Sequence, residues 1–196
     1  MNRLLTAAIV LAASSAASAQ DKWKPYQFKA DERYEFRITE TEGGKAKEVF
    51  YVMDIKSTGK KDAEGEELLE VSYTTRGTMK KSELGEKTLF GAWDMQGYGM
   101  AWAIVNALYG ALFADLTLKE GEKLSLLGLG LVKVTGKAKV ADRDGFIVQF
   151  FGKEDEKEVL NAEWIVDPAL ALPIKTTNYE GGKAKSVIEL VSYKKS

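Results

Sequence analysis

The sequence predicts a mostly β protein, in which an incomplete antiparallel β-barrel or strongly curved sheet wraps around one central apolar helix. Two observations lead to this fold class. Runs in which apolar and polar residues alternate, the pattern of strands with one buried face, occur in both halves of the chain. Between them lies a stretch without a charged side chain, residues 95–114, whose alanines and leucines favour helix. A sheet that curves around this segment would cover it on several sides.

The first strands are predicted from the alternation after residue 33. Residues 34–38 and 49–55 both alternate, and the connection through Gly43-Gly44 supplies the positive φ angles that a tight hairpin turn needs. A third alternating run covers residues 69–75, after a charged connection that belongs on the surface. We therefore expect an antiparallel meander in the first half.

Five further strands are predicted in the second half. Asp144-Gly145 and Gly181-Gly182 are hairpin turn signals there, and residues 180–185 repeat the sequence of residues 42–47. The repeat predicts two equivalent hairpins. The strand-like runs cover residues 131–141, 146–152, 159–166, 174–179 and 184–193.

The central segment is predicted to be a helix over residues 100–113. Trp102 and Tyr109 belong to an apolar stripe at helical spacing, and the neighbouring face is apolar too. A membrane span is the alternative, because the uncharged stretch of residues 95–114 is long enough to cross a bilayer. Its glycines, the polar Asn106 and the flanking Asp94 and Asp115 disfavour a span.

The first nineteen residues are typical of a secretory signal peptide. Arg3 gives a positive start, residues 4–11 are apolar, and Ala17-Ser18-Ala19 provides small residues for a signal peptidase. An uncleaved anchor is the alternative, but the apolar part is too short for ~30 Å of hydrocarbon. Cleavage predicts one β-rich domain over residues 20–196, with a net charge of 27 − 29 = −2. We expect a soluble periplasmic protein without a stable membrane span, or a secreted one as second choice.

Composition excludes several classes of function. The chain has 196 residues, 45% of them apolar and 29% charged, and its 28 basic and 29 acidic residues nearly cancel. No net positive charge therefore favours nucleic acid or an anionic membrane. The chain has neither Cys nor His, which excludes thiol nucleophiles, disulfides, imidazole bases and the usual zinc and haem sites. We expect no metal and no cofactor.

The C-terminal strands resemble a known superfamily. Trp164 lies in a strand-like run that ends at Asp167-Pro168, and Leu172-Pro173 opens the next run, followed by a Gly-Gly turn and a final strand. This order is similar to the closing strands of the LolA and LolB-like carriers of outer-membrane lipoprotein sorting, and of related periplasmic β-barrel domains. The resemblance covers about the last 35 residues. It implies an incomplete barrel whose concave face shelters apolar side chains or an acyl chain.

Catalysis is not expected, because no constellation of residues supports it. Without His, a hydrolase would need paired carboxylates, a Ser-Lys dyad or a metal held by oxygen ligands. Asp94 and Asp115 border the apolar segment, but the place of Asp94 before the N-terminus of the predicted helix, where a negative charge offsets the helix dipole, explains it without catalysis. Ser82 lies near two lysines in a connection that we expect to be exposed, and residues 142–145 lack the ligands of a calcium loop. A carboxylate-based hydrolase is kept as the exception.

The aromatic residues are the remaining functional signal. Several could line an apolar pocket for a ligand or could fill the core. We expect a periplasmic binding or carrier protein for a lipid or other apolar small molecule. The alternative is a structural or interaction module of the cell envelope with a filled core, which docks an envelope protein and binds no ligand. The candidate ligand-binding residues are Trp93, Tyr98, Trp102, Tyr109, Phe113 and Trp164.

Overall fold

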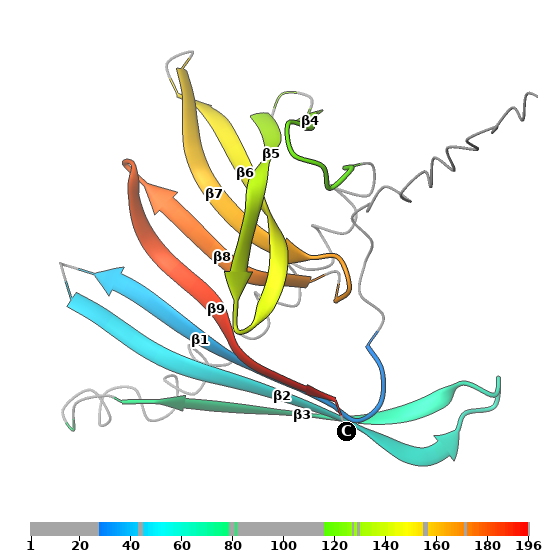
Figure 1. Ribbon diagram of the computed structural model, residues 1–196. Helices are drawn as coiled ribbons and strands as arrows, with labels where there is room; N and C mark the ends of the chain where they lie inside the picture. The colour runs from blue at the N-terminus through cyan, green and yellow to red at the C-terminus, as the bar shows by residue number, and fades with distance from the viewer. Residues whose placement is uncertain are drawn as a thin grey trace, which may run out of the picture.

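The protein forms one antiparallel sheet, shown in the computed structural model of Figure 1. The structure describes residues 28–42, 45–78, 81, 116–126, 128, 130–154, 157–170 and 172–195. Within these residues, nine strands pair in the order β3-β2-β1-β9-β8-β7-β6-β5-β4, with β3 and β4 at the two edges. The strands are β1 (Glu32–Glu42), β2 (Lys45–Lys61), β3 (Glu67–Gly77), β4 (Lys123–Leu126), β5 (Gly130–Val140), β6 (Arg143–Glu154), β7 (Lys157–Asp167), β8 (Leu172–Glu180) and β9 (Lys183–Lys195).

The predicted strands of the first half are confirmed. In β1, Tyr34, Phe36 and Ile38 are buried and alternate with partly exposed polar residues, as one-sided strands require. Strand β2 pairs with β1 and has the same alternation of buried residues, and Tyr34 lies opposite Met53 in the register. The β1–β2 pairing extends to Glu42 opposite Lys45. The predicted glycine pair of this turn, residues 43–44, lies outside the described residues.

The two predicted turns of the second half have different outcomes. Gly181 and Gly182 have φ of 57° and 74° and join β8 to β9, so this hairpin is confirmed. The turn predicted at Asp144-Gly145 is wrong, because Ala141 and Asp142 form it, with φ of 47° and 64°. Gly145 lies inside β6, where an added Cβ would come within 2.6 Å of Ile165 Cγ2. Close packing against β7, and not turn geometry, explains this glycine.

Curvature brings distant strands of the sheet together. Register shifts, which bend strands and increase their twist, interrupt six of the eight strand pairs. Figure 1 shows the β5–β6 turn beside β9, and the Cζ of Arg143 lies 5.0 Å from the centre of the Tyr193 ring. One buried cluster combines side chains of β1, β2, β8 and β9 with Val140 of β5, Ile165 of β7 and Leu170 of the β7–β8 connection. A second cluster lies on β5, β6 and β7, with Leu116 and Leu118 beside them.

The predicted fold class is therefore wrong in its architecture. The described residues form an open nine-stranded sheet, and no central helix lies among them. The prediction assumed that the apolar segment forms a helix and that the sheet curves around it to cover it. In the structure, the curved sheet brings Val140, Ile165 and Leu170 onto the residues of β1 and β2. The segment predicted as a helix, residues 100–113, lies outside the described residues, as does the predicted signal peptide.

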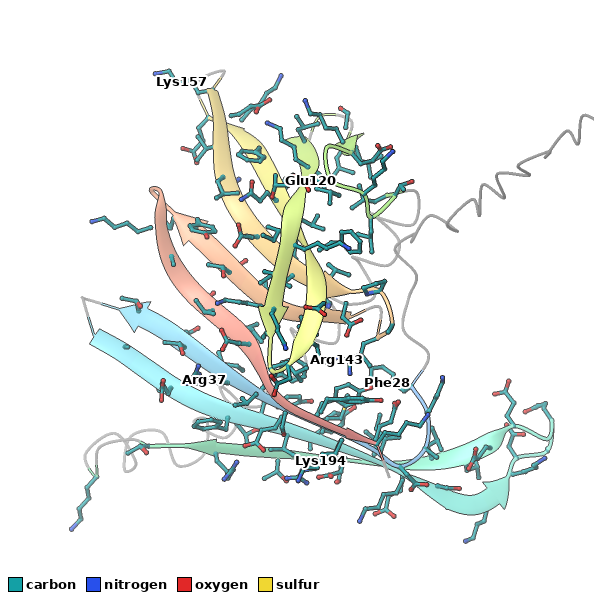
Figure 2. The ribbon with its side chains drawn as sticks, in the orientation of Figure 1. Phe28, Arg37, Glu120, Arg143, Lys157 and Lys194 are labelled. Carbon is teal, nitrogen blue, oxygen red and sulfur yellow. The ribbon has the colours of Figure 1, made fainter. Side chains whose placement is uncertain are left out.

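A polar network fastens the β5–β6 turn to the rest of the sheet. Arg143, labelled in Figure 2, pairs through Nε with Asp167 Oδ2, and its Cζ lies 5.0 Å from the centre of the Tyr193 ring. The Tyr193 hydroxyl donates to Glu32 Oε1 at 2.9 Å, and the Tyr34 hydroxyl donates to Glu32 Oε2 at 3.1 Å. These contacts link β6 and β7 to β9 and β1, from which β8 separates them in the order of the sheet.

The described part of the chain contains no helix with the length and apolarity needed to cross a membrane.

Candidate functional site

Only one predicted ligand-binding residue is described by the structure. Trp164 lies on β7, is 3% exposed, and packs in the second cluster with its ring centre 6.5 Å from that of Phe150. Its role as a ligand contact stays a prediction. The other five candidates lie outside the described residues, namely Trp93, Tyr98, Trp102, Tyr109 and Phe113.

A pocket of about 350 Å³ lies at the β4 edge of the sheet. This volume is within the range of small-molecule sites, which are roughly 300–1,000 Å³. Leu126, Leu131 and Phe151 provide apolar walls from β4, β5 and β6, and the register places Leu131 opposite Phe151. The remaining lining residues are Ser125, Gly128, Gly130, Lys153 and Glu158.

Glycine at residue 130 is required for the shape of this pocket. Its φ is +146°, a conformation that residues with a side chain rarely adopt. A Cβ at this position would overlap the carbonyl oxygen of Phe151 and would lie 2.8 Å from Cε2 of Phe150. Gly128 also has a positive φ, of 76°, but an added Cβ would meet nothing within 4 Å. The backbone of β5 therefore approaches β6 more closely at residue 130 than a side chain would allow.

Positive charge is concentrated beside the pocket. Lys133 Nζ lies 2.7 Å from Glu158 Oε2 and 4.2 Å from the centre of the Phe151 ring. The hydrogen bond from Lys133 is the main cause that holds the pKa of Glu158 below its ordinary value, and the charges of Lys133, Lys123 and Lys153 act in the same direction. Three lysines thus surround one glutamate. The surplus of two positive charges suits an anionic group.

The pocket was not found from the sequence because its residues come from four strands. Residues 146–152 were predicted as a strand, but nothing in the sequence indicated that they line a pocket. Strand β4, which contributes Ser125 and Leu126, was not predicted at all. A usable signal is the pair of glycines at residues 128 and 130, since Gly next to a strand often marks a close backbone approach.

The carboxylates that the structure buries are held by internal hydrogen bonds. Glu32 is 2% exposed and accepts bonds from Tyr34, Tyr193 and the Lys29 amide. Asp167 is 4% exposed, pairs with Arg143 and accepts from the Ala169 amide at 2.8 Å. These contacts give both carboxylates structural roles. The described residues contain no cluster of three or more acidic residues that could hold a metal ion.

Comparisons with known proteins give no sequence relative. No model of a known protein family matches the chain, and no curated protein matches it. Among solved structures it is similar to MucB in the Pseudomonas aeruginosa MucA/MucB complex, with 9% identity and a TM-score of 0.38, over 83% of this chain and 51% of that one. The chain thus spans about half the length of MucB.

Two other solved structures are also similar to the chain. One is a protein with a YmcC-like fold from Bacteroides fragilis, with 10% identity and a TM-score of 0.35, over 89% of this chain and 99% of that one. The other is a DUF1329 family protein from Desulfovibrio piger, with 12% identity and a TM-score of 0.24, over 85% and 86%. These values assign no function, and the resemblance to LolA and LolB-like carriers stays a prediction.

Proposed function

We propose that this protein is a non-catalytic binding protein of the periplasm, and that its pocket at the β4 edge takes an amphiphile with an apolar chain and one acidic group. The observation that carries the proposal is the combination of apolar walls in the pocket and lysines in and beside it. Neither property alone would distinguish an amphiphile from an apolar molecule or a simple anion.

The apolar part of the ligand would lie against the side chains of β4, β5 and β6. Leu126, Leu131 and Phe151 provide aliphatic and aromatic surface, and burial of apolar surface contributes about 25 cal/mol per Å². The polar lining atoms come from few residues, as is usual where polar groups orient a ligand and apolar ones hold it.

The acidic group would lie near Lys153. Lys133 is already paired with Glu158, whereas Lys153 lines the pocket and has no ion pair among the described contacts. An ammonium group on a flexible stem can follow the position of a carboxylate or a phosphate. Lys123 and Lys133 lie opposite each other in the β4–β5 register and add to the positive potential.

Binding of three probes that share a twelve-carbon chain and differ in the charge of the head group tests this proposal. Calorimetric titration is carried out with laurate, dodecanol and dodecyltrimethylammonium, each below the concentration at which it forms micelles. Laurate should bind one to one, dodecanol more weakly, and dodecyltrimethylammonium most weakly. Exchange of the negative head group of laurate for the positive head group of dodecyltrimethylammonium should lower the affinity roughly tenfold.

Variants locate the binding. Lys153→Glu should weaken laurate binding, and Leu131→Trp should fill the cavity and reduce binding of all three probes. The matched control is Lys60→Glu, which makes the same change of charge at an exposed position near the end of β2, far from β4 in the sheet. If laurate does not bind, or if the two pocket variants bind it as well as the control does, the proposal is wrong.

A further inference from the structure

The β3 edge of the sheet has the properties of an interaction surface. Within the described residues, β3 pairs with β2 on one side and with no strand on the other. Three of its side chains are apolar and exposed, namely Leu68 at 44%, Val71 at 43% and Tyr73 at 61%. This surface is separate from the pocket, which lies at the opposite edge.

Edge strands are normally protected against pairing with other chains. Short length, inward charges, proline and bulges are the usual devices. Strand β4 has the first of these, with four residues. Strand β3 has eleven residues, and its centre, Val71-Ser72-Tyr73-Thr74-Thr75, has no charge, no proline and several residues of high β propensity. It therefore offers an edge that can accept another strand.

The exposed ring of Tyr73 at this edge packs on the ring of a buried tyrosine. The Tyr73 ring stacks on that of Tyr51, with ring centres 5.8 Å apart and an interplanar angle of 23°. Tyr51 is itself only 6% exposed, and burial raises the pKa of its hydroxyl, with a smaller contribution from Tyr73. A buried ring beneath Tyr73 limits its motion, so less conformational entropy is lost when it packs against a partner.

We propose that the occupant of this edge is a second copy of the same chain, with the two β3 strands antiparallel and Tyr73 opposite Tyr73. This register places Glu70 of each copy opposite Arg76 of the other, and Val71 opposite Thr75. Two cross-strand ion pairs and a central aromatic pair then form around one two-fold axis, as an isologous interface requires.

The charges of β3 select this register over its neighbour. With Ser72 on the axis, Glu70 would lie opposite Thr74 and Arg76 opposite Leu68, so neither charged residue would meet its opposite. Arg76 Nη2 already bonds Glu35 Oε1 at 2.6 Å, and the Arg76 side chain remains 61% exposed. Its guanidinium can therefore also donate a hydrogen bond to a carboxylate of the second copy.

Sedimentation velocity over a concentration series tests the proposal. The wild-type protein should dimerise, and Glu70→Arg should raise the dissociation constant about tenfold or more, because two attractive pairs become repulsive. The double variant Glu70→Arg, Arg76→Glu should restore dimerisation. Glu64→Arg is the matched control, since it reverses an exposed charge in the β2–β3 turn, outside β3, and should not affect dimerisation.

Tyr73→Lys provides a second variant that does not depend on the ion pairs, and it should give a folded monomer. Far-ultraviolet circular dichroism checks that each variant keeps its sheet. A wild-type protein that stays monomeric at every soluble concentration would overturn the proposal. A dimer that Glu70→Arg and Tyr73→Lys leave unchanged would overturn it too, because the contact would then lie elsewhere.

Discussion

Replacement of Gly130 by alanine should destabilise the protein far more than the same replacement at Gly128. Both glycines line the pocket and both have positive φ. They differ in the space around them, because a Cβ at residue 130 overlaps the backbone of Phe151 and one at residue 128 meets nothing. The pair therefore separates backbone strain from steric overlap.

The expected magnitudes follow from these two terms. At residue 128, the left-handed conformation costs alanine about 1–2 kcal/mol, of which about 0.4–1 kcal/mol is offset by the lower entropy of the unfolded chain. At residue 130, the strain is about 1–3 kcal/mol before the overlap, and the overlapping atom is a carbonyl oxygen held in β6. We expect a loss of about 1 kcal/mol for Gly128→Ala and about 3 kcal/mol or more for Gly130→Ala.

Thermal unfolding followed by circular dichroism measures the difference. For a chain of this size, 1 kcal/mol lowers the melting temperature by about 2–4 °C, so the two variants should differ by about 4–8 °C. Gly130→Ala should also weaken laurate binding, because β5 must move away from β6 at the pocket. Equal melting temperatures for the two variants would refute the close approach of residue 130 to Phe151.

Three further predictions concern the rest of the sheet. Burial tends to raise the pKa of Glu189, but its hydrogen bond to Lys175 and the charges of Lys175 and Arg37 outweigh this and hold the pKa below its ordinary value of 4.5. Its stabilising contribution is thus present above that value and lost as pH falls through the lower pKa of the folded state, so Glu189→Gln should flatten the acid limb of the stability profile. Arg143→Met should cost about 3 kcal/mol in urea unfolding, because it removes the ion pair of buried Asp167, and a loss below 1 kcal/mol would contradict the network. Ile174→Val should cost about 1 kcal/mol at a fully buried position, whereas Val191→Ala, at an exposed one, should change stability by less than about 0.5 kcal/mol.

The strands could be predicted because their residues alternate within a short window. In β1 and β2 the buried residues occupy every second position, and no distant contact is needed to recognise this. Strand β4 was missed because four residues give too few alternations. The turn at residues 141–142 was missed because Ala and Asp carry positive φ there, while the more typical Asp-Gly pair lies three residues later in the chain.

The architecture and the pocket depend on information that is not local. Curvature arises from register shifts within strand pairs, which the sequence of one strand alone does not predict. The lysines beside Glu158 come from β4, β5 and β6, so only the pairing of strands brings them together. Five of the six aromatic candidates lie outside the described residues, and the sixth, Trp164, is a core residue in the structure.

The position of β9 has a consequence for how the chain folds. Among the described strands it comes last in chain order, yet it lies between β1 and β8, near the middle of the sheet. The hairpins on either side can form from neighbouring residues, but the first three strands cannot join the others until residues 183–195 are available. This pairing of β1 with β9, about 150 residues apart in the sequence, has a high contact order and is expected to be slow. A chain shortened before β9 would leave β1 and β8 as two new open edges, which makes the C-terminus a poor place for truncation.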